Sequence, residues 1–419
     1  MSRYARKKKR NKAVRKTFIA VLIGGGVILA ALVYTMSYLY EQLNEILISY
    51  NSAQETPLAP AAQTIAPVNE EEEDYAYTFE APVIVSERDE YILYIGDLEL
   101  PVSGATGFAP VRLEMREQPD AASAALKTLE PGAGFLILNE QDEWWEISSG
   151  GETGFVRHEL CMINLPDVIP SIRYNNTNTY NSRFASNSYA IPNISGESLY
   201  AGRTYNNRLE KEEYIVAVMY SMSKRIQVAQ RRALADGNCL VIYEGFRPLS
   251  IQKKIADELR ALSEMNSDVN AGLNSPPWSI SWFIATGVSN HQRGCSIDVS
   301  LVQPTLDFAL SGNYKYLTHA QAPYYYNMPS PIHELSRDAV AFANPVTIDI
   351  NTNLSGLSLS PGMRDNQAAQ DLQRYCTTAG LTPLASEWWH FDDLRSRSGV
   401  PGNSVGDYIL SEVYSVAPE

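Results

Sequence analysis

Two short stretches decide what this chain can be: Ser289-Asn290-His291-Gln292-Arg293-Gly294-Cys295-Ser296-Ile297-Asp298 and Glu387-Trp388-Trp389-His390. They bring imidazoles and carboxylates from two distant parts of the chain. A catalytic zinc ion needs three nitrogen or oxygen ligands, an open position for water and a nearby carboxylate to take the water's proton. His291, Asp298 and His390 fill the three ligand positions, and Glu387 fills the position of the base.

The spacing of Glu387 and His390 sets a condition on this hypothesis. The two residues are three positions apart in a segment that is predicted to be a strand. On a regular strand they would face opposite sides of the sheet. The hypothesis therefore requires a turn or a bulge that brings both side chains to one site.

In their order along the chain, these motifs resemble those of the zinc D-alanyl-D-alanine metallopeptidases, and most closely the D-Ala-D-Ala dipeptidases of vancomycin resistance. The family pattern is Ser-x-His, then Arg-Gly-x-x-x-Asp, then Glu-Trp-Trp-His, and the matching residues are Ser289, His291, Arg293, Gly294, Asp298 and Glu387-Trp388-Trp389-His390. The resemblance spans about 166–395. It implies Zn²⁺ as the cofactor, with the ligands and base named above.

Two further segments extend the resemblance. Gly245-Phe246-Arg247-Pro248 matches an aromatic-Arg-Pro motif, which implies that Arg247 stabilises the substrate and its tetrahedral intermediate. The family also has a loop in which an Asp holds the free amine of the dipeptide, and here His333 stands at that position with Glu334 beside it. Ser289, His333 and Glu334 are therefore the candidate substrate-binding residues, and recognition of a free amine is an open point.

Two enzyme functions follow from the resemblance. A dipeptidase would hydrolyse free D-Ala-D-Ala, and the motifs favour this activity. A D,D-carboxypeptidase would remove the terminal D-Ala from peptidoglycan stem peptides, which suits an external location and the change at His333. An alternative of another class is a catalytically silent receptor that binds the cell wall.

Helical and strand patterns alternate through 166–419, which predicts an α+β domain with helices around a small antiparallel sheet. The expected helices are Glu210–Leu234, Ser250–Met265 and Gln367–Ala379, and the expected strands are Leu240–Tyr243 and Trp388–Phe391.

The preceding region, 81–165, is rich in short β-patterns separated by glycine turns, which predicts a small all-β barrel. It resembles a bacterial SH3 domain through four features, which are Val111-Arg112, Pro131-Gly132, Trp144-Trp145 and Gly154-Phe155-Val156. The resemblance implies binding to the cell wall or to a peptide. The alternative is a structural spacer.

The N-terminal region predicts a membrane anchor. Residues 1–16 carry nine Lys or Arg and no acid, and 17–40 carry no charge. Such an apolar segment can span a bilayer, and the positive-inside rule places 1–16 in the cytoplasm as a basic tail and the catalytic region outside. The segment 41–80 is rich in Pro and Glu and predicts a flexible stalk. A cleaved signal peptide is the alternative to the anchor.

Charge and cysteine content exclude other classes. The net charge is −14 over 419 residues although the first sixteen residues are strongly basic, so the rest of the chain is a poor ligand for nucleic acid. The four cysteines are too few for a disulfide scaffold and form no Cys-x-x-Cys pair, which argues against a cysteine zinc site. One or two disulfide bridges are compatible with the sequence.

Overall fold

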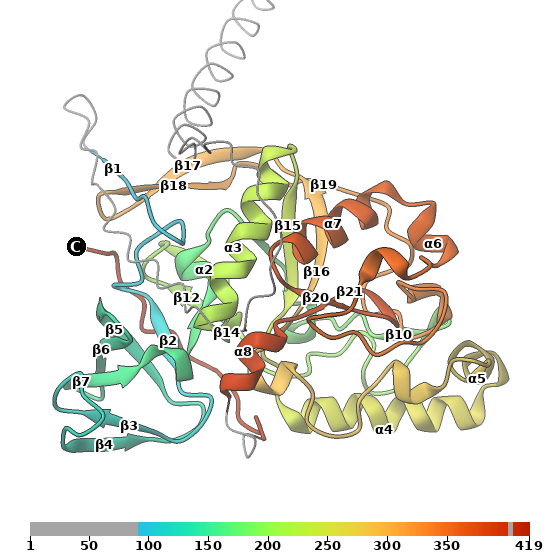
Figure 1. Ribbon diagram of the computed structural model, residues 1–419, viewed down its shortest axis with the longest axis horizontal. Helices are drawn as coiled ribbons and strands as arrows, with labels where there is room; N and C mark the ends of the chain where they lie inside the picture. The colour runs from blue at the N-terminus through green and yellow to red at the C-terminus, as the bar shows by residue number, and fades with distance from the viewer. Residues whose placement is uncertain (1–90, 401–404) are drawn as a thin grey trace, which may run out of the picture. The chain divides into compact units, whose positions relative to one another are not determined.

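A computed structural model describes residues 91–400 and 405–419, which belong to one compact unit (Figure 1). The predicted basic tail 1–16, the membrane segment 17–40 and the stalk 41–80 lie outside the described residues. Among the residues that are described, no helix has the length and apolar character needed to cross a membrane.

An eight-stranded sheet takes seven strands from the predicted β-barrel region, 81–165, and its edge strand β14 from later in the chain. Its strands lie in the order β14-β8-β2-β5-β6-β7-β3-β4 and every pair is antiparallel. Alternating residues of β5 and β6 are buried, so one face of the sheet forms the core around Phe135, Ile137 and Trp145. The strands are β2 (Thr106–Phe108), β3 (Leu113–Arg116), β4 (Ala125–Leu129), β5 (Gly134–Gln141), β6 (Trp144–Ser149), β7 (Glu152–Arg157), β8 (Met162–Asn164) and β14 (Ala217–Met219).

The remainder is mixed α/β and is organised on a six-stranded sheet with the path β20-β21-β16-β15-β9, to which β19 adds by pairing with β16. Its pairs are antiparallel except for β15 with β9. The strands are β9 (Arg173–Tyr174), β15 (Cys239–Glu244), β16 (Ser296–Gln303), β19 (Tyr324–Tyr325), β20 (Thr382–Leu384) and β21 (Glu387–Asp392).

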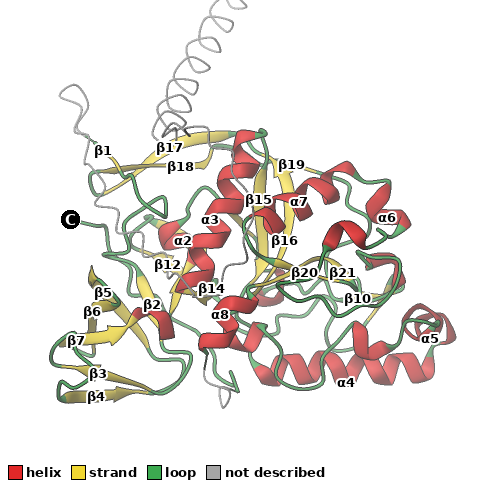
Figure 2. Ribbon diagram, in the orientation of Figure 1, coloured by secondary structure: helices red, strands yellow, loops and turns green. Residues whose placement is uncertain are grey.

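The two faces of this sheet differ in chemistry. Ile242, Ile297 and Phe391 point to one face, which belongs to the main hydrophobic core; α3 contacts β15, and α7 contacts β16 and α3. Asp298 and His390 occupy the alternate positions and therefore point to the other face. The sheet thus uses its apolar face for stability and leaves the polar face for a site. Figure 2 shows the strands of this sheet together with helices α3 and α7.

Helices and smaller strands complete the region. The α-helices are α2 (Leu165–Val168), α3 (Tyr220–Ala235), α4 (Leu249–Met265), α5 (Ser267–Asn274), α6 (Pro361–Arg364), α7 (Gln367–Thr378) and α8 (Leu394–Gly399). The 3-10 turns are η1 (His158–Leu160), η2 (Thr177–Thr179), η3 (Ile280–Trp282), η4 (His291–Arg293), η5 (Arg337–Ala339) and η6 (Leu354–Gly356). The small sheets are formed by β1 (Ile92–Leu93) with β18 (Tyr314–His319) and β17 (Leu306–Ser311), by β10 (Ala185–Ser186) with β11 (Tyr189–Ala190), and by β12 (Arg203–Asn206) with β13 (Lys211–Tyr214).

One predicted helix is corrected at its beginning. The sequence predicts a helix over Glu210–Leu234, but α3 begins at Tyr220, and β13 and β14 occupy the preceding residues. The reason is tertiary: β14 pairs with β8 at the edge of the eight-stranded sheet, which buries Val218 completely. Pairing with a distant strand therefore overrides the helical spacing of the apolar residues.

The barrel region and the mixed region are joined by more than one chain segment. Besides the β8–β14 pair, the C-terminal segment 405–419 connects them. Tyr408 stacks on Phe246 with ring centroids 4.6 Å apart, and Ser415 bonds through its hydroxyl to Thr106 and Asp167 at 2.6 and 2.5 Å. These buried contacts make the barrel an integral part of the described unit.

Candidate metal centre

Strand pairing brings two of the predicted ligands together. In the register of β16 and β21, Asp298 lies directly opposite His390. Residues directly opposite on neighbouring strands point to the same face with their Cβ atoms about 5 Å apart. The polar pair is therefore placed by backbone hydrogen bonds of two buried strands.

The third predicted ligand arrives on the turn that precedes β16. His291 begins η4, and Gly294 ends it with φ of 66°, a left-handed conformation that glycine adopts without strain. A Cβ at this position would lie 2.6 Å from the sulfur of Met162. The Arg-Gly step of the motif thus has a physical reason, because it reverses the chain into β16 directly behind the histidine.

The three predicted ligands form a compact cluster. His291 Nε2 lies 3.2 Å from His390 Nδ1 and 3.3 Å from Asp298 Oδ1, and the latter two atoms are 3.1 Å apart. All three residues are buried. Donor atoms bonded to one tetrahedral zinc ion at about 2.0 Å would be separated by about 3.3 Å. The donor set and its spacing therefore fit a zinc ion.

Outer hydrogen bonds select the nitrogen that each imidazole presents. His291 Nδ1 lies 2.7 Å from the carbonyl oxygen of Gly245, so this nitrogen donates and Nε2 keeps its lone pair for the cluster. His390 Nε2 lies 2.9 Å from a carboxylate oxygen of Asp392, which leaves Nδ1 free in the same way. Asp392 also accepts a bond from Ser296 at 2.5 Å. The motif analysis did not identify Asp392, although its position two residues after His390 puts it on the same strand face.

Glu387 reaches the site because β21 is irregular. The register with β20 pairs Pro383 with Phe391 and then Leu384 with Glu387, so β21 carries extra residues at this point. This is the strand irregularity that the three-residue spacing of Glu387 and His390 requires if both side chains are to reach one site. Glu387 Oε2 lies 3.8 Å from His390 Nδ1, and Glu387 is buried.

Burial and charge act in opposite directions on the two carboxylates. Burial raises the pKa of Glu387 to about 8, more than the nearby His390 lowers it. Burial also disfavours the charge on Asp298, but His291 and the other imidazoles hold its pKa well below the usual value. A cation in the cluster would lower the pKa of Glu387 from about 8 towards neutrality. Asp298 is therefore held ionised, as a metal ligand must be, whereas Glu387 without a nearby cation is held protonated at neutral pH.

Arg247 stands beside the cluster as a fixed cation. Its Nε lies 3.1 Å from Glu244 and its Nη2 lies 3.6 Å from Asp298. Burial alone would lower the pKa of Arg247, but these carboxylates keep it raised. The ring of Phe184 lies 5.3 Å from the guanidinium carbon. Arg247 is therefore held charged at the edge of the site.

A second cluster shares Asp298 with the first and consists of Glu244, Asp298 and His333. One cation is already present, because Arg247 lies against both of its carboxylates. Glu244 also accepts bonds from Asn178 at 2.8 Å and Tyr200 at 2.7 Å. The guanidinium of Arg247 thus already occupies the place beside the second cluster that a metal ion would need.

The three candidate substrate-binding residues have different surroundings. Ser289 lines the cavity at the metal cluster, and its hydroxyl donates to Gln292 at 2.8 Å. His333 is fully buried with φ of 61°, and its Nε2 lies 3.1 Å from Asp298 Oδ2. The Glu334 carboxylate accepts bonds from the backbone N–H groups of Asn187 and Ser188. Of the three, Ser289 is the one at the metal cavity.

The cavity at the cluster has a volume of about 330 Å³. Arg247, Glu387, His291 and His390 contribute to its wall, together with the aromatic side chain of Trp389. This volume matches the small end of ordinary ligand pockets, of about 300–1,000 Å³. The arrangement can hold a peptide carbonyl among a metal ion, a base and a guanidinium.

The four cysteines take no part in the cluster. All are buried and free, which leaves the disulfide alternatives of the sequence without support. Cys295 lies between two predicted ligands, but its sulfur faces the carbonyl oxygen of Arg293 at 3.5 Å. Burial raises the pKa of this thiol above its usual value, so it stays protonated at neutral pH.

Comparison with known proteins identifies one part of the chain. Residues 109–161 match a family model described as "Bacterial SH3 domain", which agrees with the resemblance drawn from the Val-Arg, Pro-Gly, double-Trp and Gly-Phe-Val features. A search of curated proteins finds no match.

Proposed function

We propose that a chain carrying a bacterial SH3 domain next to this cluster is a zinc peptidase of the cell envelope, with 166–419 as its α+β catalytic region. The observation that carries the proposal is the set of spacings of 3.1, 3.2 and 3.3 Å among the donor atoms of His291, Asp298 and His390. Specificity for D-Ala-D-Ala rests on the motif resemblance alone.

A zinc ion bound by these three residues would polarise the scissile carbonyl and acidify a water molecule. Glu387 takes a proton from the attacking water, whose oxygen forms a bond to the carbonyl carbon. The C–N bond then breaks, and Glu387 passes the proton to the leaving amine. Arg247 donates to the oxygen on which negative charge develops, which stabilises the transition state. A cation bound by the cluster would lower the pKa of Glu387 and so favour the ionised form that accepts the first proton.

The contacts of Glu334 favour the carboxypeptidase over the dipeptidase. A free dipeptide carries an ammonium group that needs a carboxylate partner in the cavity. Glu334 is engaged by two backbone N–H groups, and His333 is engaged by Asp298. The acidic residues that do line the metal cavity are Asp298, Glu387 and Asp392, and each has another role. We therefore place removal of the terminal D-Ala of a stem peptide ahead of dipeptide hydrolysis.

The other parts of the chain suit this reaction. The SH3 match suggests binding to the cell wall or to a protein partner. Binding to the cell wall would bring the catalytic region close to the peptidoglycan. In the same proposal, 17–40 anchors the chain in the membrane as a single span, with the N-terminus in the cytoplasm and the catalytic region outside.

A silent wall-binding receptor is the rival of another class. Incubating muropeptides with the purified full chain and analysing them by mass spectrometry separates the two. The proposal expects loss of one D-Ala from pentapeptide stems, whereas a dipeptidase would leave the stems unchanged and convert free D-Ala-D-Ala to alanine. A receptor would bind without changing either substrate.

A further inference from the structure

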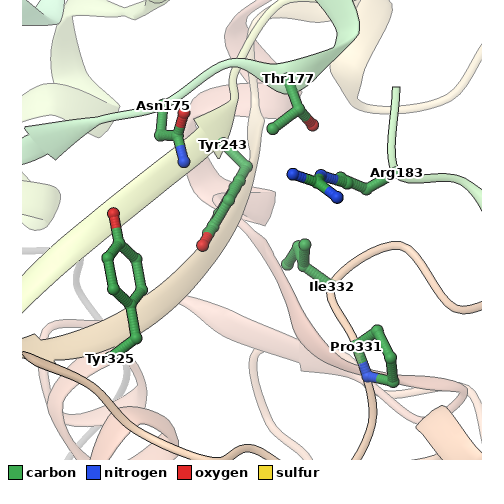
Figure 3. A pocket seen from close by; sticks show the side chains of 7 residues that line it. All are labelled: Asn175, Thr177, Arg183, Tyr243, Tyr325, Pro331 and Ile332. Atoms are coloured by element: carbon green, nitrogen blue, oxygen red, sulfur yellow. The ribbon is translucent and has the colours of Figure 1, made fainter. Parts of the chain in front are cut away.

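A second cavity lies next to the metal cavity and is lined by Asn175, Thr177, Arg183, Tyr243, Tyr325, Pro331 and Ile332 (Figure 3). Its volume is about 480 Å³. The site described above does not use it.

The two cavities are built on the same chain segments. Tyr243 lines the second cavity, and the next residue, Glu244, belongs to the cluster at Arg247. Ile332 likewise lines the second cavity and precedes His333, whose ring lies 6.3 Å from the Tyr243 ring. The His333 imidazole also reaches Asp298 at 3.1 Å. One side chain, His333, thus stands between a predicted metal ligand and the wall of the second cavity.

The lining of the second cavity has an excess of hydrogen-bond donors. Arg183 is exposed, and within 91–400 and 405–419 no ion pair involves it. None of the seven lining residues is acidic. Asn175 is less available, because its carbonyl oxygen accepts from Tyr180 at 2.7 Å and its side chain also bonds to Tyr243.

Thr177 supplies an independent sign of a ligand. The residue is 1% exposed, and its hydroxyl has no hydrogen-bond partner among the described residues. A buried polar atom without a partner is costly and uncommon. In Figure 3 this hydroxyl and the guanidinium of Arg183 point into the same space. A ligand group that accepts hydrogen bonds from Thr177 and Arg183 would remove the free-energy cost of the unpaired hydroxyl.

We propose that this cavity is a subsite for a carboxylate carried by the peptide substrate, bound by Arg183 and Thr177. A carboxylate is acceptor-only when ionised and matches the planar guanidinium in two bonds. The inference rests on the proposed peptidase function, because it places the peptide in the metal cavity with an acidic residue upstream of the scissile bond. The subsite would make the enzyme select acidic peptides.

The test uses pairs of peptides that end in D-Ala-D-Ala and differ in one upstream residue, Glu or Gln, placed in turn at the third, fourth and fifth residue from the carboxyl end. For the wild-type full chain with zinc, we expect the Glu peptide to have a kcat/KM about 10-fold higher at one of these positions. Arg183→Ala should reduce this ratio to about one, and Arg183→Lys should restore part of it. Arg232→Ala changes an exposed arginine of α3 that lines neither cavity and should keep the ratio.

A second readout does not depend on turnover. Calorimetric binding of the same peptide pairs to Glu387→Gln protein should show the same preference and the same loss in the double variant with Arg183→Ala. A ratio of one in the wild type at every position, or a ratio that Arg183→Ala leaves intact, would overturn the subsite. Inhibition by free glutarate without a peptide preference would mean a site for free anions and would also overturn it. If no peptide is hydrolysed while the binding preference persists, the proposed reaction fails and the subsite stands.

Discussion

Two clusters of similar composition meet at Asp298. The first consists of His291, Asp298 and His390, and the second of Glu244, Asp298 and His333. Both are buried, and both bring their ligand atoms within 4.8 Å of one another. They differ in their neighbours: Arg247 lies against both carboxylates of the second cluster, whereas the first cluster borders a cavity of about 330 Å³ with Glu387 in its wall.

The difference shows that residue types in proximity do not define a metal site. In the second cluster a guanidinium lies against both carboxylates, so a metal ion there would be repelled by Arg247. In the first cluster, outer hydrogen bonds from His291 and His390 leave one lone pair on each ring directed at the other donors. The nearby cation and the direction of the lone pairs are therefore the two features by which we propose the first cluster, and not the second, as the metal site.

The largest expected effect comes from removing a ligand of the first cluster. His390→Ala should lose zinc and activity together, because one of three protein ligands is gone. The loss of zinc affinity should exceed the 10–100-fold that changes outside the ligand shell usually cost. Metal analysis and turnover on the same preparation check it. If the variant kept one tightly bound zinc ion, residues other than His390 would have to be the ligands.

Glu387→Gln should separate chemistry from metal binding. The amide keeps the shape of the side chain but takes no proton, so hydrolysis should fall by about 10²–10⁴-fold while zinc remains bound. Steady-state kinetics and metal content are the measurements. Loss of zinc in this variant would make Glu387 a ligand, and full activity would exclude it as the base.

Arg247→Ala removes the cation of the second cluster and tests whether the first cluster depends on it. The first cluster should keep its zinc, since Arg247 is not a ligand, and kcat should fall by about 10²–10³-fold because the oxyanion loses a donor. Arg247→Lys should recover part of the rate, as it restores the charge but not the paired N–H groups. Arg247→Ala protein that loses its zinc would show that the two clusters are not independent.

The smallest effect is expected from Asp392→Asn. The substitution weakens the bond that orients His390, so zinc affinity should fall by about 10–100-fold with the ligand set intact. Competition with a chromophoric chelator would measure it. At saturating zinc most of the activity should return. If it does not return, Asp392 takes part in the reaction itself and not only in orienting His390.

Much of the site could be predicted because its residues are close together in two short motifs. The structure brings His291, Asp298 and His390 to one point and places Glu387 beside them. Their chemical roles stay predictions. The spacing of Glu387 and His390 also predicted the need for an irregular strand, which the shift between β20 and β21 provides.

Other features depend on contacts that a single sequence does not contain. The helix predicted from Glu210 begins at Tyr220, because pairing between β8 and β14 decides the preceding residues. The role of His333 was not predictable either. Its backbone has a φ of 61° and its imidazole lies 3.1 Å from Asp298, a contact that the motifs do not indicate.

We propose that the chain hydrolyses peptides with one zinc ion held by the first cluster. The most direct measurement is to strip the purified full chain with a chelator, add zinc in steps and follow D-Ala release from a pentapeptide that ends in D-Ala-D-Ala. We predict no activity in the stripped protein and full recovery at one zinc equivalent, with Glu387→Gln binding the same equivalent but releasing no D-Ala. Undiminished release from the stripped protein, or no release at any zinc level, would contradict the account.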